Sequence, residues 1–136
     1  MPRTVLLLAV PLLLLAAACA PAPTLVPAPD PVFFAAAPID VAGTVIQAIS
    51  TSPGINDSTG WMITQADTMG GFVRAETEVN VPGGFLRRMT TRTEFVSVVV
   101  APAGEGRTQV VIQRTDGATE LAERIMRVLR ERYGLN

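Results

Sequence analysis

The chain has 136 residues, of which 49% are hydrophobic and 17% charged, and its formal net charge at pH 7 is −1. Because nucleic-acid-binding domains carry a basic patch, this charge balance argues against a nucleic acid as partner. The sequence contains no histidine, no lysine and one cysteine, which excludes Ser/His/Asp and Cys/His catalytic sites, the common zinc sites and the Gly-x-x-x-x-Gly-Lys phosphate loop.

The N-terminal segment has the three parts of a secretory signal. Residues 1–4 carry one positive charge, Arg3, residues 5–15 are apolar and include Pro11, and three alanines follow at 16–18. A charged start, a short apolar core and a small-residue end predict a signal peptide over residues 1–18. The apolar run is shorter than the roughly 20 residues that a spanning helix needs, so a permanent transmembrane helix is the less favoured alternative.

Residues 16–19, Ala-Ala-Ala-Cys, resemble the lipobox of bacterial lipoprotein precursors, whose pattern is roughly Leu-Ala-(Gly/Ala)-Cys. Alanine stands here in place of the favoured leucine. The resemblance implies a diacylglyceryl thioether on the sulfur of Cys19, cleavage before Cys19, and often acylation of the new amino group, for example with palmitate. Because Ala20 is not the aspartate that usually retains such proteins in the inner membrane, the resemblance favours the outer membrane in a diderm host. The alternative is an ordinary signal peptide with an incidental cysteine.

Residues 19–38 are rich in proline and alanine and contain six of the eleven prolines. Proline favours an extended chain, so this segment is interpreted as a lipidated tether. At about 3.1 Å per residue, residues 20–31 could hold a domain some 35 Å from the membrane. The alternative is a proline-rich recognition ligand. Val32, Phe33 and Phe34 differ from their surroundings and predict a short edge strand or plug on the domain, or else a partner or membrane contact.

Two segments have the apolar spacing of helices. Residues 39–50 repeat apolar residues three or four apart and follow Pro38, which suits a first helical turn. Residues 118–129 carry the apolar stripe of a second helix, for which Asp116 is a suitable cap and Gly134 a suitable end.

Four segments between these helices have strand character, at residues 61–66, 72–79, 87–100 and 107–114. The second alternates apolar residues with charged ones, for example Val73 and Ala75 with Arg74 and Glu76, as expected of an antiparallel sheet with one buried face. We therefore predict a single α+β domain over residues 39–136. It consists of a helix, a four-stranded antiparallel sheet and a helix, with both helices on one face of the sheet.

The candidate site residues belong to a possible binding surface rather than to a catalytic site. Four arginines of the predicted strands could form a basic patch for an anionic headgroup, a glycan or a partner protein. These are Arg74, Arg87, Arg88 and Arg92. The alternative is that glutamates 76, 78 and 94 on neighbouring strands pair with them.

Two aromatic residues complete this possible surface. Trp61 begins the first predicted strand, where it belongs either to the core or to a stacking platform at the mouth of a groove. Phe85 lies near the tip of the glycine-containing connection at residues 80–86.

Together these features predict a cell-envelope lipoprotein on the exported, periplasmic side of the membrane, anchored through a lipid on Cys19. Its small domain is expected to act by non-catalytic contact with an envelope protein, as an interaction or assembly component. The alternative is a module that binds a lipid or small amphiphile between sheet and helices, which needs a cavity of at least about 300 Å³. We expect no enzymatic activity, no cofactor and no metal.

Overall fold

The computed structural model describes residues 22–56, 58–83 and 89–134. The predicted signal peptide, Cys19, Phe85, Arg87 and Arg88 lie outside these residues. The elements follow in the order β1 (Leu25–Val26), β2 (Val32–Phe34), α1 (Pro38–Ser50), β3 (Met62–Asp67), β4 (Phe72–Pro82), β5 (Met89–Pro102), β6 (Thr108–Thr115), the 3₁₀ turn η2 (Asp116–Ala118) and α2 (Thr119–Tyr133). This confirms the α+β class, the antiparallel pairing and the two helices.

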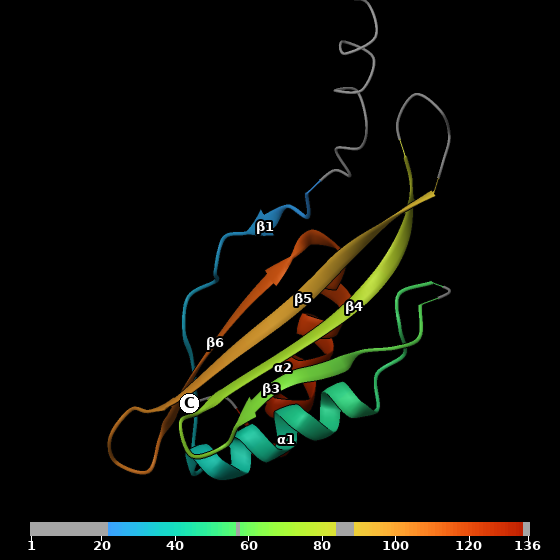
Figure 1. Cartoon of the computed structure of the whole chain (residues 1–136). Coiled ribbons are helices and arrows are strands. Elements are labelled where there is room, and N and C mark those ends of the chain that lie inside the picture. Colours follow the sequence, from blue (N-terminus) through green and yellow to red (C-terminus); the bar gives the residue numbers. More distant parts are fainter. Residues whose placement is uncertain (1–21, 57, 84–88, 135–136) are drawn as a thin grey trace, which may run out of the picture.

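The strands form one antiparallel sheet in the order β1-β6-β5-β4-β3, and β2 also pairs with β6. Figure 1 shows the two helices as a second layer, with α2 behind the strands in that view and α1 alongside β3. One face of the sheet is therefore covered by both helices, and we call the other the open face. Helix α1 contacts β3, β4 and β5, while α2 contacts α1 and β6.

The prediction of four strands is wrong, because the sheet has six. The two additional strands, β1 and β2, come from the proline-rich segment and cover the outer edge of β6. Phe34 is completely buried in the core, and the Thr108 hydroxyl donates to the carbonyl of Ala36 at 2.5 Å. Proline lacks an N–H group, but the short stretches between the prolines retain theirs and pair with the free edge of β6.

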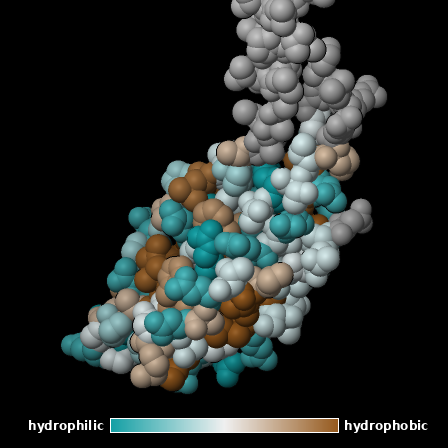
Figure 2. Space-filling model, in the orientation of Figure 1, coloured by the Kyte–Doolittle hydropathy of each residue, from teal (hydrophilic) through white to brown (hydrophobic). Residues whose placement is uncertain are grey.

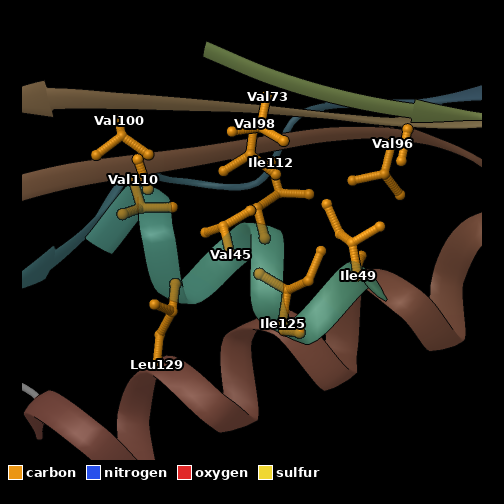
Figure 3. Packing of buried hydrophobic residues seen from close by; sticks show 14 of the residues in the cluster. Val45, Ile49, Val73, Val96, Val98, Val100, Val110, Ile112, Ile125 and Leu129 are labelled. Atoms are coloured by element: carbon orange, nitrogen blue, oxygen red, sulfur yellow. The ribbon is translucent and has the colours of Figure 1, made fainter. Parts of the chain in front are cut away.

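The core lies between the covered face and the helices (Figure 3). Because side chains alternate along a strand, every second residue of β4, β5 and β6 points toward the helices. These core residues include Val73 and Ala75 of β4, Val96, Val98 and Val100 of β5, and Val110 and Ile112 of β6. The helices contribute, among others, Val45 and Ile49 of α1 and Ile125 and Leu129 of α2. The predicted buried side of β4 is thus confirmed, and so are the predicted stripes of both helices except at Ile39, which is 52% exposed.

Two local contacts set the geometry at the ends of the layers. Gly71 has a φ of 68°, and a Cβ there would lie 1.8 Å from the carbonyl oxygen of Val100, so the β3–β4 turn requires glycine. In the helix layer, the Tyr133 hydroxyl lies 2.8 Å from the Thr44 hydroxyl and donates to the carbonyl of Asp40 at 3.0 Å. The end of α2 is thereby tied to the first turns of α1.

Candidate interaction surfaces

The arginines predicted to form one basic patch are separated by the sheet. Arg74 pairs in register with Ser97, and Arg92 with Val79. Val79 is buried under the helices, whereas Arg74 alternates with the buried Val73 and Ala75. Arg74 therefore lies on the open face and Arg92 on the covered face, so these two residues do not contribute to the same surface.

On the open face, Arg74 is held by three neighbours. Its Nε donates to Glu76 Oε1 at 2.7 Å, its Nη1 donates to Ser97 Oγ at 3.3 Å, and its guanidinium carbon lies 4.1 Å from the centroid of the Phe95 ring. About a third of each charged side chain remains exposed, 34% for Arg74 and 31% for Glu76. The result is a flat, neutralised charge pair over an aromatic ring, which is accessible to a partner.

Exposed apolar side chains also lie on the open face. Val99 is 45% exposed at the centre of the sheet, and its cross-strand neighbours are Phe72 on β4 and Val111 on β6. Phe33 on β2 is 37% exposed. Figure 2 shows separate hydrophobic spots among hydrophilic and intermediate residues rather than one continuous hydrophobic area. Non-obligate interfaces have the same mixed character as the rest of a protein surface, so the open face has the composition that such a contact needs without being marked by it.

On the covered face, Arg92, whose side chain is 20% exposed, forms an ion pair with the buried Glu94, one of the glutamates considered as partners of the arginines. Glu94 is completely buried, and its Oε1 lies 2.5 Å from Nη2 of Arg92. This is a close charge contact rather than an aligned hydrogen bond, because neither Glu94 Oε1 nor Arg92 Nε has a hydrogen-bond partner among the described residues. Glu94 Oε2 accepts the N–H of Gly117 at 3.2 Å, and Arg92 Nη2 lies 3.8 Å from Asp116 Oδ1. The pair therefore connects β5 to the start of α2.

Trp61 lies half-buried against the core and also lines a cleft of about 250 Å³. The cleft is bounded by residues 52–55 and by the first turns of α2. Its charged lining residues, Glu120, Glu123, Arg124 and Arg127, are balanced in sign. Arg124 Nη2 donates to the carbonyl of Thr51 at 3.3 Å, which ties the wall of the cleft to the end of α1.

A second groove, of about 430 Å³, runs between β6 and α2 beneath the proline-rich segment. Its apolar lining residues are Pro29, Ile112, Ala122 and Met126. Arg114, Arg130 and Glu123 are its charged lining residues. The space between the sheet and the helices is filled by the core, so this groove opens at the edge of the two layers.

The described part of the chain contains no group of three or more acidic or cysteine side chains that could hold a metal ion. Among its helices, none combines the length and the apolar character needed to span a bilayer. Comparison of the whole chain with protein-family models and with curated proteins finds no match.

Proposed function

We propose that this chain is a lipoprotein of the bacterial cell envelope, anchored through Cys19, whose α+β domain acts by contact with another envelope protein rather than by catalysis. The observation that carries the anchor is the lipobox-like sequence at residues 16–19, placed directly after the features of a secretory signal. Stable anchoring takes two or more acyl chains, which matches the diacylglyceryl group that the resemblance implies.

The pairing of β1 supports a tether shorter than the proline content suggests. The N–H of Asp116 donates to the carbonyl of Thr24 at 2.9 Å, and Leu25 pairs with Thr115. The chain from Cys19 to Thr24 can therefore span at most about 18 Å, at roughly 3.6 Å per residue. On this proposal the domain stays close to the headgroups, within reach of partners in the same membrane.

The open face supports a protein partner. It presents the neutralised pair of Arg74 and Glu76 on β4, the exposed Val99 on the neighbouring strand β5 and, at the far edge of the sheet, the exposed Phe33 on β2. The absence of histidine from the whole sequence also removes the commonest general base.

The anchor is tested by the intact mass of protein extracted from membranes, with Cys19→Ser as the matched control. We expect a chain that begins at Cys19 and carries acyl mass, and we expect this mass to be lost in the variant. An unmodified cysteine in the mature wild-type chain would refute the anchor.

The protein contact is tested by chemical crosslinking in native membranes followed by mass spectrometry. Val99→Glu adds a charge to the open face, and the same change at Met69, which is 88% exposed in the β3–β4 turn, is the control. We expect the first variant to lose a crosslinked envelope protein that wild type and Met69→Glu retain. An unchanged set of partners in a folded Val99→Glu protein would refute this use of the open face.

The second groove favours one alternative, a binding module for a small amphiphile with an anionic head. Its apolar lining residues suit an acyl chain, and Arg114 and Arg130, which outnumber Glu123, suit a carboxylate or phosphate. Titration with a fluorescent fatty acid distinguishes the two functions. Saturable binding that the exposed substitution Arg130→Glu abolishes would support the alternative, and no saturable binding would reject it.

A further inference from the structure

Strands β4 and β5 continue beyond the rest of the sheet at one end. Strand β3 pairs with β4 only as far as Glu76, and β6 pairs with β5 only from Val96 onward. Beyond these two levels, β4 and β5 pair as strands only with each other within the described part of the chain. We call residues 78–82 and 89–93 the β4–β5 arm, and Figure 1 shows it projecting past the helices.

The chain that leads to Cys19 leaves the domain at this same end. Strand β1 is antiparallel to β6, and β6 is antiparallel to β5, so β1 and β5 run in the same direction. Because β5 begins in the arm at Met89, the chain before β1 also leads toward the arm (Figure 1). Continuing the register between β5 and β6 places Asp116, whose N–H donates to the carbonyl of Thr24, level with Glu94.

From this common level, the arm and the chain to Cys19 reach nearly equally far. Five residues separate Glu94 from Met89, so the end of the arm lies about 17 Å beyond the level, at roughly 3.3 Å per residue. Five residues also separate Thr24 from Cys19, and they span at most about 18 Å. A membrane that holds a lipid on Cys19 therefore lies at about the height of the arm's end when this chain is fully extended, and nearer when it is not.

The end of the arm has a composition that suits contact with lipid headgroups. Residues 80–82 on β4 and 89–91 on β5 carry no charge, and charges are costly to move out of water. Met89 is 63% exposed, so its apolar side chain is available for contact. The opposite end of the sheet, by contrast, presents Glu105 and Arg107 in the exposed turn between β5 and β6.

We propose that the end of the β4–β5 arm rests on the headgroups of the same bilayer that holds Cys19. This inference rests on the lipid anchor proposed above. The domain then has two points of attachment to the membrane, the lipid and the arm, and its strands stand upright on the surface. The open face is directed sideways, toward proteins in the same membrane, rather than toward the bilayer.

The test measures quenching of a fluorescent label on the acylated full chain in vesicles of phosphatidylethanolamine and phosphatidylglycerol, with a nitroxide quencher on the lipid headgroup. The labelled variants are Met89→Cys, Thr91→Cys and Thr93→Cys, at exposed positions on one face of β5 and at increasing distance from the arm's end. Met69→Cys is the matched control, because Met69 is 88% exposed in the turn at the other end of β4.

We expect the label at residue 89 to lose most of its fluorescence, the loss to fall through residues 91 and 93, and residue 69 to show none. Equal losses at residues 89 and 69 in acylated protein would overturn the contact of the arm and leave the anchor standing. Equal losses at residues 89 and 93 would mean that the arm lies flat on the membrane, which would overturn the upright arrangement.

The unsubstituted chain separates this inference from the anchor. An acylated Cys19 has no free thiol, so the unsubstituted chain should take up no label. Labelling of that chain would refute the anchor and, with it, the position of the arm. Acyl mass on Cys19 together with an unquenched label on Met89→Cys would refute the arm alone.

Discussion

The carboxylate of Glu94 lies directly against the backbone of Gly117. Glu94 is completely buried, and its Oε2 accepts the N–H of Gly117 at 3.2 Å. A Cβ added to Gly117 would lie 2.5 Å from Cδ of Glu94 and 2.8 Å from its Oε1. A side chain at this position would therefore have to displace the buried carboxylate that links β5 to the turn preceding α2.

We expect Gly117→Ala to destabilise the domain by about 1–3 kcal/mol, the usual cost of overpacking a filled interior. The added methyl group must displace a carboxylate that is also in contact with Arg92. Urea denaturation followed by circular dichroism measures this difference in the free energy of unfolding.

Gly43→Ala is the matched control, and it should have the opposite sign. Gly43 lies inside α1, and a Cβ there would meet nothing within 4 Å. Alanine should therefore stabilise the helix by about 0.5–1 kcal/mol relative to glycine. Stabilisation by Gly117→Ala as well would show that the carboxylate does not occupy this position.

Arg92→Met should cost about 3 kcal/mol, because it leaves the buried Glu94 carboxylate without a cation. The double variant Arg92→Met/Glu94→Met removes both charges and should cost less than the single one. A thermodynamic cycle from denaturation curves tests this, with Glu94→Met as the fourth corner. Additive costs of the two single variants would contradict a coupled pair.

Arg74→Met on the open face should cost less than about 1 kcal/mol, although Arg74 also has an acidic partner and stacks on Phe95. The pair of Arg74 and Glu76 is about a third exposed, at 34% and 31%, and ion pairs at such sites contribute little. Thermal unfolding beside Arg92→Met measures the contrast. A loss as large as that of Arg92→Met would contradict the assignment of the two arginines to different faces.

The contrast between these two arginines shows which side chains could be assigned to a face of the sheet from the sequence. The alternation of residues 73–79 predicts correctly which side chains of β4 are buried. On β5, Arg92 and Glu94 alternate in phase with Val96 and Val98, which points to the covered face. Buried charges are rare unless paired, so composition favoured a surface role. The ion pairs also form along one strand, between residues two apart, whereas cross-strand pairs were expected.

The proline-rich segment shows where sequence patterns fail. Strands β1 and β2 contain two and three residues, which is too short for a period of two to be recognised. Their partner β6 begins at Thr108, far along the chain. The pairing therefore depends on a sheet edge that local patterns do not reveal. Only the edge strand predicted for Val32, Phe33 and Phe34 is confirmed.

Only part of the binding surface predicted from the sequence lies within the described residues. Phe85, Arg87 and Arg88 lie outside the described residues, as does Cys19. Trp61 is described, and it joins the cleft beside α2 rather than the open face with Arg74. The sequence therefore predicted individual residues of a surface without predicting which of them lie together.

Adjacent phenylalanines in β2 give the sharpest test of whether the tether segment belongs to the domain. Phe34 is completely buried, whereas Phe33 is 37% exposed on the open face. Phe34→Ala should therefore cost about 3–5 kcal/mol, the range for truncating a buried phenylalanine. Phe33→Ala should cost less than about 1 kcal/mol, because an exposed side chain leaves no cavity.

Urea denaturation of the two variants beside wild type measures both values. The two substitutions lie at adjacent positions of the same three-residue strand, so both variants share any general effect of shortening an aromatic side chain there. Equal small losses would mean that β2 detaches readily from β6, and the segment would then act as the free spacer that its prolines suggested. A large loss for Phe34→Ala alone would make β2 a structural strand of the domain, and the tether would then end before Val32.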